Sequence, residues 1–240
     1  MTNMKNEKEK EKKEPRNFAR RFASDYHIWR TLFYYFVLVF MVFPYQMIYY
    51  NLKVIGRKNL PKNRNVIYVG NHVSELDPPF VGYAVARPIA FMAKKELFEE
   101  NTIKGWLVKR LGAFSVNREK PELATFKTVK EVFQTSWGLG IFPQGGTRKN
   151  RKIEDIHKGF VLFAKKFKAD IVPISICGLE EYSKKFRGKE VKLIIGKPIS
   201  YELPEDEIVR LWCEEICKNT GYENCVTGSN SENTEETKEG

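Results

Sequence analysis

A histidine and an aspartate follow an apolar run that has the character of a buried strand. Residues 66–69 are apolar, Gly70 ends the run, His72 comes next, and Asp77 lies five positions further on. Asp caps helices well and proline fits the first helical position, so Asp77 and Pro78 predict a helix start. The two side chains therefore flank the carboxyl end of a strand, which is where ligands bind in open α/β sheets.

A turn that folds Asp77 back onto His72 would create a base. The carboxylate would hold the proton of one ring nitrogen and leave the other nitrogen as a proton acceptor. The simpler alternative is that Asp77 only caps its helix and His72 is an ordinary turn residue. A metal site formed by His72, Glu75 and Asp77 is a further alternative. Three ligands within six residues are cramped, however, and no second histidine is near.

A glycine-rich basic loop follows another predicted strand, at residues 139–142. It contains Gly145, Gly146 and Arg148. Two glycines allow backbone N–H groups to point into one concavity, and the arginine adds positive charge, a combination suited to phosphate. The loop lacks the spacing of a Walker A motif. The simpler interpretation is an ordinary glycine turn.

Two further clusters also follow predicted strands. Arg118 comes directly after residues 113–116, where its guanidinium could bind a phosphate with two hydrogen bonds. A solvated arginine is the simpler interpretation. Pro173 lies within the apolar residues 171–174, and proline disfavours the interior of a central strand but is tolerated at an edge or a bulge.

The elements that must position these residues alternate along the chain. A short strand and turn are expected at 54–61, strands at 66–69, 89–93, 113–116, 139–142, 171–176 and 191–195, and helices at 78–86, 104–111, 121–136, 156–167 and 205–218. This alternation predicts an α/β fold with a mostly parallel central sheet flanked by helices.

Charge is distributed unevenly along the 240 residues. The net charge is +11, and because residues 1–50 carry +4 and residues 219–240 carry −4, the middle of the chain itself carries +11. A basic folded region suggests phosphorylated small molecules, anionic lipid or nucleic acid as partners. The four cysteines form no CxxC pair, so no structural zinc site is expected.

An apolar and aromatic segment near the N-terminus predicts a membrane anchor. Residues 32–43 are uncharged, Pro44 interrupts the segment, and the apolar character continues to Tyr50. Counted through Tyr50, the segment barely reaches the roughly 20 residues that a span requires. Basic residues flank it on both sides, which favours a hairpin or re-entrant anchor entering one leaflet over a single span. A soluble core helix is the remaining alternative.

These features divide the chain into four predicted regions: a disordered charged tail at 1–27, the anchor at 28–52, an α/β domain at 53–218 and a second disordered tail at 219–240.

Four clusters in this order resemble the PlsC-like glycerolipid acyltransferases, above all the 1-acyl-sn-glycerol-3-phosphate acyltransferases. That family shows N-H-x-S-x-x-D, then G-x-x-F/I-x-x-R, F-P-E-G-T-R and V-P-I/V. Here the matching positions are Asn71, His72, Ser74 and Asp77; Gly112 and Arg118; Phe142, Pro143, Thr147 and Arg148; and Val172, Pro173 and Ile174. The resemblance covers residues 54–200.

The resemblance implies a general-base dyad of His72 and Asp77 that activates the hydroxyl of a lysophospholipid, lysophosphatidic acid above all. The hydroxyl would attack an acyl thioester on coenzyme A or acyl carrier protein, with no metal or other cofactor required. Substrate contacts are implied for Asn71, Ser74, Arg118, Gln144, Gly145, Gly146, Thr147 and Arg148. The protein would be membrane-associated with its active site facing the cytoplasm, and no nucleic-acid partner is expected.

The sequence departs from the family pattern at Gln144, where the family usually has Glu, and by one additional glycine. An amide can still hydrogen-bond hydroxyls but carries no charge. This departure leaves other acceptors open, namely glycerol-3-phosphate or a different lysolipid. A non-catalytic membrane- or nucleic-acid-binding module is the alternative from another class, and it would rest on the charge alone.

Overall fold

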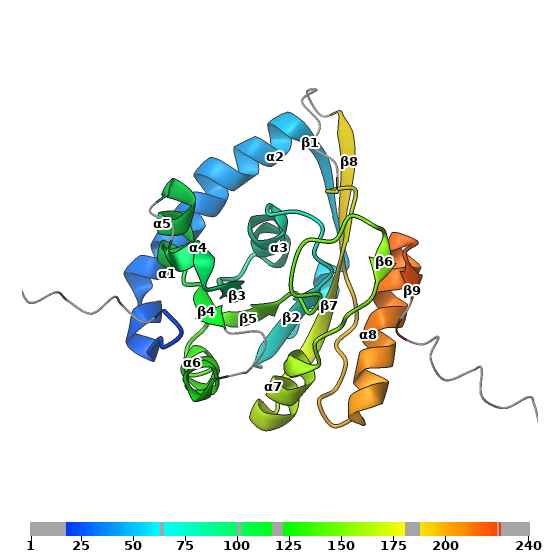
Figure 1. Cartoon of the computed structure of the whole chain (residues 1–240). Helices are drawn as coiled ribbons and strands as arrows, with labels where there is room; N and C mark the ends of the chain where they lie inside the picture. The colour runs from blue at the N-terminus through cyan, green and yellow to red at the C-terminus, as the bar shows by residue number, and fades with distance from the viewer. Residues whose placement is uncertain are drawn as a thin grey trace, which may run out of the picture.

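A seven-stranded sheet forms the centre of the protein (Figure 1). The structure, a computed structural model, describes residues 18–62, 65–99, 102–116, 122–180, 188–224 and 226. The strands of this sheet follow the order β1-β8-β7-β2-β5-β3-β4, and the β7–β8 pair alone is antiparallel among the pairs of the described sheet. The predicted α/β fold with a mostly parallel sheet is therefore confirmed.

The described strands are β1 (Tyr50–Ile55), β2 (Val66–Gly70), β3 (Ile89–Lys94), β4 (Phe114–Val116), β5 (Gly138–Ile141), β6 (Lys152–Ile153), β7 (Asp170–Cys177), β8 (Lys189–Ile195) and β9 (Glu223–Asn224). The described helices are η1 (Ala23–Tyr26), α1 (Ile28–Val37), the π-helical η2 (Leu38–Val42), α2 (Phe43–Tyr49), η3 (Arg57–Asn59), α3 (Asp77–Val85), α4 (Glu96–Glu99), α5 (Ile103–Arg110), α6 (Leu123–Val132), α7 (Gly159–Phe167) and α8 (Glu205–Thr220).

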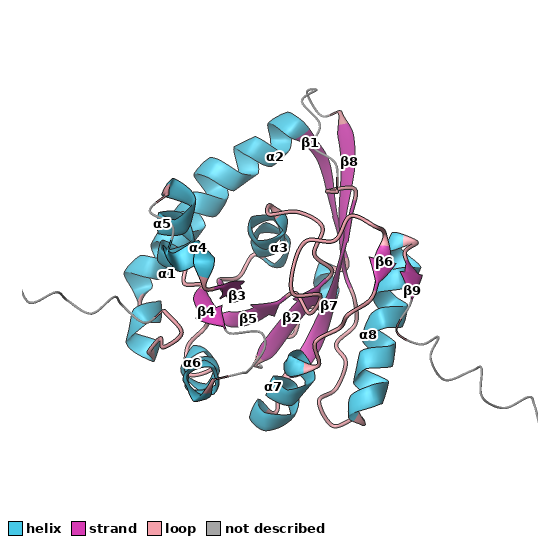
Figure 2. Cartoon of the chain, in the orientation of Figure 1, coloured by secondary structure: helices cyan, strands magenta, loops and turns pink. Residues whose placement is uncertain are grey.

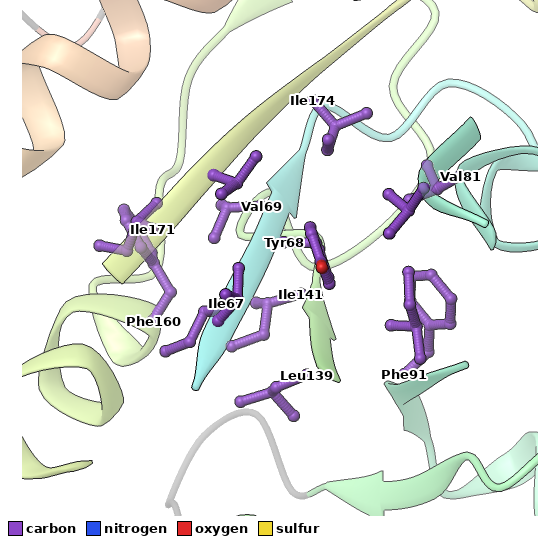
Figure 3. Packing of buried hydrophobic residues seen from close by; sticks show 14 of the residues in the cluster. Ile67, Tyr68, Val69, Val81, Phe91, Leu139, Ile141, Phe160, Ile171 and Ile174 are labelled. Atoms are coloured by element: carbon purple, nitrogen blue, oxygen red, sulfur yellow. The ribbon is translucent and has the colours of Figure 1, made fainter. Parts of the chain in front are cut away.

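Helices cover both faces of the sheet (Figure 2). Helices α6, α7 and α8 lie on one face, while α3 lies on the other, beneath the long N-terminal helix. All five residues of β2 are buried, as expected for a parallel strand with both faces covered. The side chains of Ile67, Val69 and Leu139 are among those that fill the space between the sheet and its helices (Figure 3). This core fixes the carboxyl end of β2, where the site lies.

Helix α8 shows how the sequence specifies one of these packing contacts. Its buried residues Ile208, Trp212 and Ile216 recur every four positions and form one apolar face. The Trp212 indole N–H donates a hydrogen bond of 2.9 Å to the Val69 carbonyl, so α8 is tied to the carboxyl end of β2. Gly221 ends the helix at φ 71°, a left-handed conformation that glycine adopts without steric cost.

The predicted anchor is helical from Ile28 to Tyr49 and makes no hairpin at Pro44. Proline lacks an N–H, and here the preceding turn widens: the Phe43 N–H bonds to Leu38 O, five residues back. These 22 residues are long and apolar enough to cross a membrane by length and composition. The helix ends at Tyr49, so the last three residues of the predicted anchor, 50–52, belong to β1.

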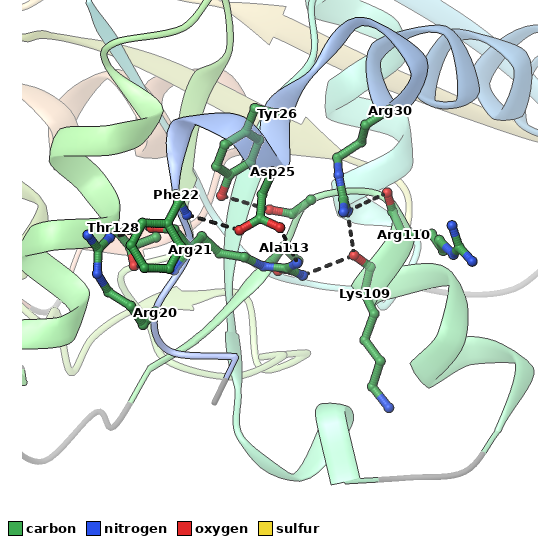
Figure 4. Close-up of polar contacts among 11 residues, drawn as sticks. Arg20, Arg21, Phe22, Asp25, Tyr26, Arg30, Lys109, Arg110, Ala113 and Thr128 are labelled. Atoms are coloured by element: carbon green, nitrogen blue, oxygen red, sulfur yellow. Dashed lines mark hydrogen bonds and ion pairs between the residues drawn. The ribbon is translucent and has the colours of Figure 1, made fainter. Parts of the chain in front are cut away.

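The boundaries of the predicted tails also differ from the structure. Residues 18–27, expected to be disordered, pack against the domain, and Arg21 is only 1 % exposed. Its guanidinium donates to the carbonyls of Lys109 and Ala113 (Figure 4). At the other end, α8 and β9 continue the described fold through residue 224. Residues 1–17 and 227–240 lie outside the described part of the chain.

Pro173 occupies the interior of β7, which has neighbours on both sides, rather than an edge strand. The ladder between β7 and β8 ends beside it, because Ile174 pairs with Ile195, the last residue of β8. The Pro173 carbonyl still accepts the Gly196 N–H at 2.9 Å. The missing proline N–H therefore costs one hydrogen bond at the end of a ladder, which explains why a central strand tolerates it.

Candidate active site

His72 and Asp77 are in contact at the carboxyl end of β2, as the sequence predicted. His72 follows the strand by two residues, and Asp77 is the first residue of α3. The His72 Nδ1 atom lies 2.7 Å from Asp77 Oδ2. The turn between them therefore brings together two side chains that a continuous helix would point in different directions. Because Nδ1 faces the carboxylate, Nε2 is the ring nitrogen that Asp77 leaves unengaged.

The Asp77 carboxylate is fully buried and organises the whole turn. Its Oδ2 atom also accepts the backbone N–H groups of Val73 at 2.7 Å and Ser74 at 2.9 Å. Its Oδ1 atom has no hydrogen-bond partner among the described residues. Desolvation raises the pKa of Asp77, and the hydrogen bonds from His72 and the backbone oppose that rise. Asp77 is thus a ring-orienting carboxylate as well as the start of α3.

The loop that follows β5 holds His72 from the other side. The Gln144 side chain accepts the His72 N–H at 3.1 Å, and the Arg148 N–H donates to the His72 carbonyl at 2.7 Å. The Phe142 ring stacks on the imidazole with centroids 4.4 Å apart. Both peptide groups of His72 and one face of its ring are therefore fixed by a single segment, residues 142–148.

His72 lies at the wall of a large apolar cavity of about 850 Å³. The cavity is bounded by the long N-terminal helix through Leu38 and Met41 and by α5 through Leu107. Phe160 and Phe163 of α7 line it as well. A volume of this size, lined mainly by aliphatic and aromatic side chains, suits a flexible hydrocarbon chain. The site therefore combines a carboxylate-paired imidazole with an apolar compartment.

The structure divides the predicted substrate-binding residues into two groups. Gly145, Gly146 and Thr147 line the cavity close to His72. Gly145 has φ 69°, and a side-chain carbon added at Gly146 would meet no atom within 4 Å, so there is open space over this glycine. Ser74 contributes its backbone N–H to Asp77, and its hydroxyl accepts the Leu76 N–H at 3.3 Å.

The remaining predicted residues differ from this group: two hold backbone groups, one forms an ion pair, and one is not described. Asn71 is fully buried, and its amide bonds both backbone groups of Ile176, at 2.9 and 2.8 Å. It ties β2 to β7 instead of facing the cavity. Gln144 is 3 % exposed and holds backbone groups. The Arg148 guanidinium pairs with Asp155 at 3.2 Å beside the loop. Arg118 lies in residues 117–121, outside the described part of the chain.

Three charged residues, Glu75, Lys94 and Lys104, also line the cavity. Lys104 of α5 pairs with Glu75 of the turn at 2.6 Å, and Lys94 ends β3 nearby. The ion pair with Lys104 lowers the pKa of Glu75. His157 lines the cavity too. The position of Lys94 in the sequence could have indicated this placement, because Lys94 lies at the carboxyl end of a strand in the same sheet.

No group of three or more His, Cys, Asp or Glu side chains in the described ranges is arranged to hold a metal ion. Glu75, a ligand in the metal alternative, is instead paired with Lys104.

Comparisons with known proteins agree with this architecture. A family model described as acyltransferase matches residues 51–177, just over half of the chain. The chain is 33 % identical over 149 residues to the 1-acyl-sn-glycerol-3-phosphate acyltransferase of Bacillus subtilis, covering 62 % of this chain and 73 % of that protein. It is 33 % identical over 140 residues to the enzyme of the same name from Streptococcus pneumoniae, covering 58 % of this chain and 51 % of that protein.

A solved structure shows the same fold. PlsC of Thermotoga maritima, a 1-acyl-sn-glycerophosphate acyltransferase, superposes with a TM-score of 0.63 over 80 % of each chain at 23 % identity. The match of the family model to more than half of the sequence, together with the Bacillus subtilis relative, establishes the classification: this chain belongs to the acyltransferase family and is an acyltransferase enzyme.

Proposed function

We propose that this enzyme transfers an acyl chain from a thioester, on coenzyme A or acyl carrier protein, to the sn-2 hydroxyl of lysophosphatidic acid, forming phosphatidic acid. The names of the relatives from Bacillus subtilis and Streptococcus pneumoniae support this acceptor. The observation that carries the proposal is the contact of 2.7 Å between His72 and Asp77 at the wall of an apolar cavity.

In the proposed reaction, His72 Nε2 takes the proton of the acceptor hydroxyl as its oxygen attacks the thioester carbonyl. The tetrahedral species then collapses, the C–S bond breaks, and the sulfur leaves as a thiolate that receives a proton, so that the products are an ester and a free thiol. Asp77 keeps the ring oriented and balances the imidazolium charge. A thioester is already activated, so a base contributing about 10²–10⁴-fold together with positioning suffices, and the step needs no metal.

The substrates would occupy different parts of the site. The acyl chain fits the cavity beneath the N-terminal helix, where Leu38 and Leu107 face it. The acceptor's phosphate fits the segment Gly145 to Thr147, where an additional carbon at Gly146 would meet open space. Lys94 adds positive charge to the cavity wall, where the charge of Lys104 is balanced by Glu75. In this proposal Arg148 and Arg118 also attract the phosphate.

Membrane association is the second part of the proposal. One face of the Ile28–Tyr49 helix packs on the domain through Tyr34, Val37 and Val42. The opposite face exposes large apolar side chains: Ile28, Trp29, Leu32, Phe36, Val39, Phe40, Met47 and Ile48. A helix that lies along its domain in this way (Figure 1) is suited to enter one leaflet from the side. The active site would then face the cytoplasm.

The direct test is an acyl-transfer assay with the purified full-length protein. Lysophosphatidic acid, glycerol-3-phosphate and a non-phosphorylated lysolipid are each offered with acyl-CoA and with acyl carrier protein. The proposal expects the highest kcat/KM with lysophosphatidic acid. Preference for another acceptor would contradict the choice of lysophosphatidic acid, and no transfer to any of the three acceptors would refute the proposed reaction.

Vesicle co-sedimentation tests the membrane part separately. Phe36→Ser and Phe40→Ser remove exposed aromatic rings that lie outside the cavity lining, and together they should reduce binding to anionic vesicles. Leu123→Ser on α6, whose side chain is 69 % exposed, is the matched control and should bind like the parent. Equal binding by all three proteins would contradict this mode of attachment.

A further inference from the structure

The buried amide of Gln144 joins two backbone groups from different segments. Its Oε1 atom accepts the N–H of His72 at 3.1 Å, and its Nε2 atom donates to the carbonyl of Lys152 at 3.2 Å. These contacts use both polar atoms of the side chain, which is 3 % exposed. An acyl acceptor would have to reach these same atoms in order to bind Gln144. The Gln144 side chain therefore holds backbone groups of the site.

The two partners require opposite hydrogen-bonding capacities at the two ends of the side chain. The His72 N–H needs an acceptor, and the Lys152 carbonyl needs a donor. An uncharged amide supplies both, whereas an ionised carboxylate supplies only acceptors. A glutamate in the same place would direct lone pairs at the Lys152 carbonyl inside a buried site, where an unpaired charge is costly.

The far end of this bridge is itself supported. Lys152 belongs to β6, which pairs in parallel with β9 near the C-terminus. The Lys152 ammonium also forms an ion pair of 3.1 Å with Glu223 of β9. At the near end, the Arg148 N–H holds the His72 carbonyl, so both peptide groups of the histidine are fixed. A side chain between two supported segments can set the position of a third group accurately.

We propose that Gln144 is a positioning residue for the transfer reaction: it fixes the backbone of His72 so that the imidazole meets both Asp77 and the substrate hydroxyl. It does not contact the acceptor, and it does not select it. This inference rests on the proposed function of His72 as the base. It also implies that the glutamine in this chain leaves the choice of acceptor unchanged.

The test separates kcat from KM in the full-length enzyme. Gln144→Met keeps the length of the side chain and removes both hydrogen bonds. Because a misplacement of about 1 Å can cost about 10²-fold in rate, kcat should fall by about 10- to 100-fold. The KM for the acceptor should stay close to that of the parent. A raised acceptor KM with an unchanged kcat would show a substrate contact and overturn the inference.

A second variant tests the need for a donor toward Lys152. Gln144→Glu should lower kcat at neutral pH, and the ratio of its activity to the parent's should rise as the pH falls, because a protonated carboxyl can again donate. A ratio that stays flat with pH would overturn the inference. The other titratable and charged groups around this side chain are present in both proteins, so the ratio isolates what the new carboxyl group adds: His72, Asp77, Arg148, Lys152, Asp155, His157 and Glu223.

Controls keep this test distinct from that of the proposed function. Gln134 is exposed near the end of α6, so Gln134→Met and Gln134→Glu should match the parent in kcat and in pH dependence. Thermal unfolding of each variant shows whether it folds, and if Gln144→Met does not, Gln144→Glu still gives the pH ratio. Any acceptor that the parent uses serves for these measurements. A parent inactive on lysophosphatidic acid would therefore refute the assigned acceptor and leave the role of Gln144 to be decided by its own kcat and KM.

Discussion

Asp77 Oδ2 lies 2.7 Å from Nδ1 of His72. The same oxygen accepts the N–H groups of the two residues that follow the histidine, so one atom both orients the ring and closes the turn. The second carboxylate oxygen is buried without a hydrogen-bond partner in the described ranges. This arrangement favours orientation over stability, since desolvation of the carboxylate outweighs its stabilising contacts and raises its pKa.

Asp77→Asn should lower acyl transfer by about 10²-fold or more while leaving the protein at least as stable at pH 7. An asparagine oxygen can still accept the backbone N–H groups, but the ring loses its carboxylate. Because burial raises the pKa of Asp77 above 3.8, its ionised form destabilises the fold above the raised pKa, and protonation relieves this cost as the pH falls.

Thermal unfolding of parent and Asp77→Asn between neutral and acid pH checks the sign. The advantage of the variant in free energy of unfolding should be largest near pH 7 and shrink as the pH falls through the raised pKa. A parent that is clearly more stable than the variant at pH 7 would show that the hydrogen bonds of Asp77 outweigh its desolvation.

Arg21→Ala should destabilise the protein strongly. The guanidinium is buried and donates to the carbonyls of Lys109 and Ala113, at 3.0 and 2.8 Å (Figure 4). Its removal takes the guanidinium from the buried Ala113 carbonyl and empties a buried site, while the Lys109 carbonyl keeps its hydrogen bond from Arg30. The expected loss in free energy of unfolding is about 3 kcal/mol. Arg20→Ala is the control, because Arg20 is partly exposed and pairs with Glu131, which predicts a loss of about 1 kcal/mol or less. Equal losses in urea unfolding would contradict the burial of Arg21.

Leu107→Trp should shift the preferred acyl donor toward shorter chains. Leu107 lines the apolar cavity from α5, and an indole there would occupy space that the account assigns to the chain. The same substitution at Leu162, whose side chain on α7 is 43 % exposed and outside the cavity lining, should leave the preference unchanged. The measurement is kcat/KM over a series of saturated acyl-CoA lengths. If kcat/KM of Leu107→Trp depends on acyl-chain length as the parent's does, the acyl chain does not lie in this cavity.

Gly146→Ala should leave stability unchanged and weaken acceptor binding. The added carbon would meet no protein atom within 4 Å, yet it would enter the space assigned to the phosphate. A rise in acceptor KM of about tenfold corresponds to about 1.4 kcal/mol of lost binding. The KM for the thioester should change less. If the KM values for the acceptor and the thioester change equally, the phosphate does not bind beside Gly146.

Much of the fold follows from local sequence patterns. The apolar run of β2 predicts a strand buried on both faces, and the spacing of Ile208, Trp212 and Ile216 predicts the buried face of α8. The contact of His72 with Asp77 was also predictable, because a strand end and a helix start fix both residues near one sheet edge. Each of these features is determined by residues that lie close together in the sequence.

Other features depend on contacts between distant segments, which spacing does not encode. Asn71 bonds Ile176 across two strands, and Gln144 bonds Lys152 and His72, so side chains predicted to bind substrate hold the backbone instead. Arg21 belonged to a charged stretch that predicted disorder, yet its guanidinium is buried against carbonyls of Lys109, near the end of α5, and Ala113, just beyond it. In each case the hydrogen-bonding partner belongs to a different segment of the chain.

The central claim is that the His72 imidazole accepts the proton of the acceptor hydroxyl. It is tested most directly by kcat of the folded His72→Ala variant with lysophosphatidic acid and an acyl thioester. The control is His157→Ala, which removes another cavity-lining imidazole that bonds no carboxylate in the described part of the chain. We expect His72→Ala to lose about 10²–10⁴-fold in kcat and His157→Ala to retain most of its turnover. Turnover of His72→Ala within about tenfold of the parent would contradict the central claim.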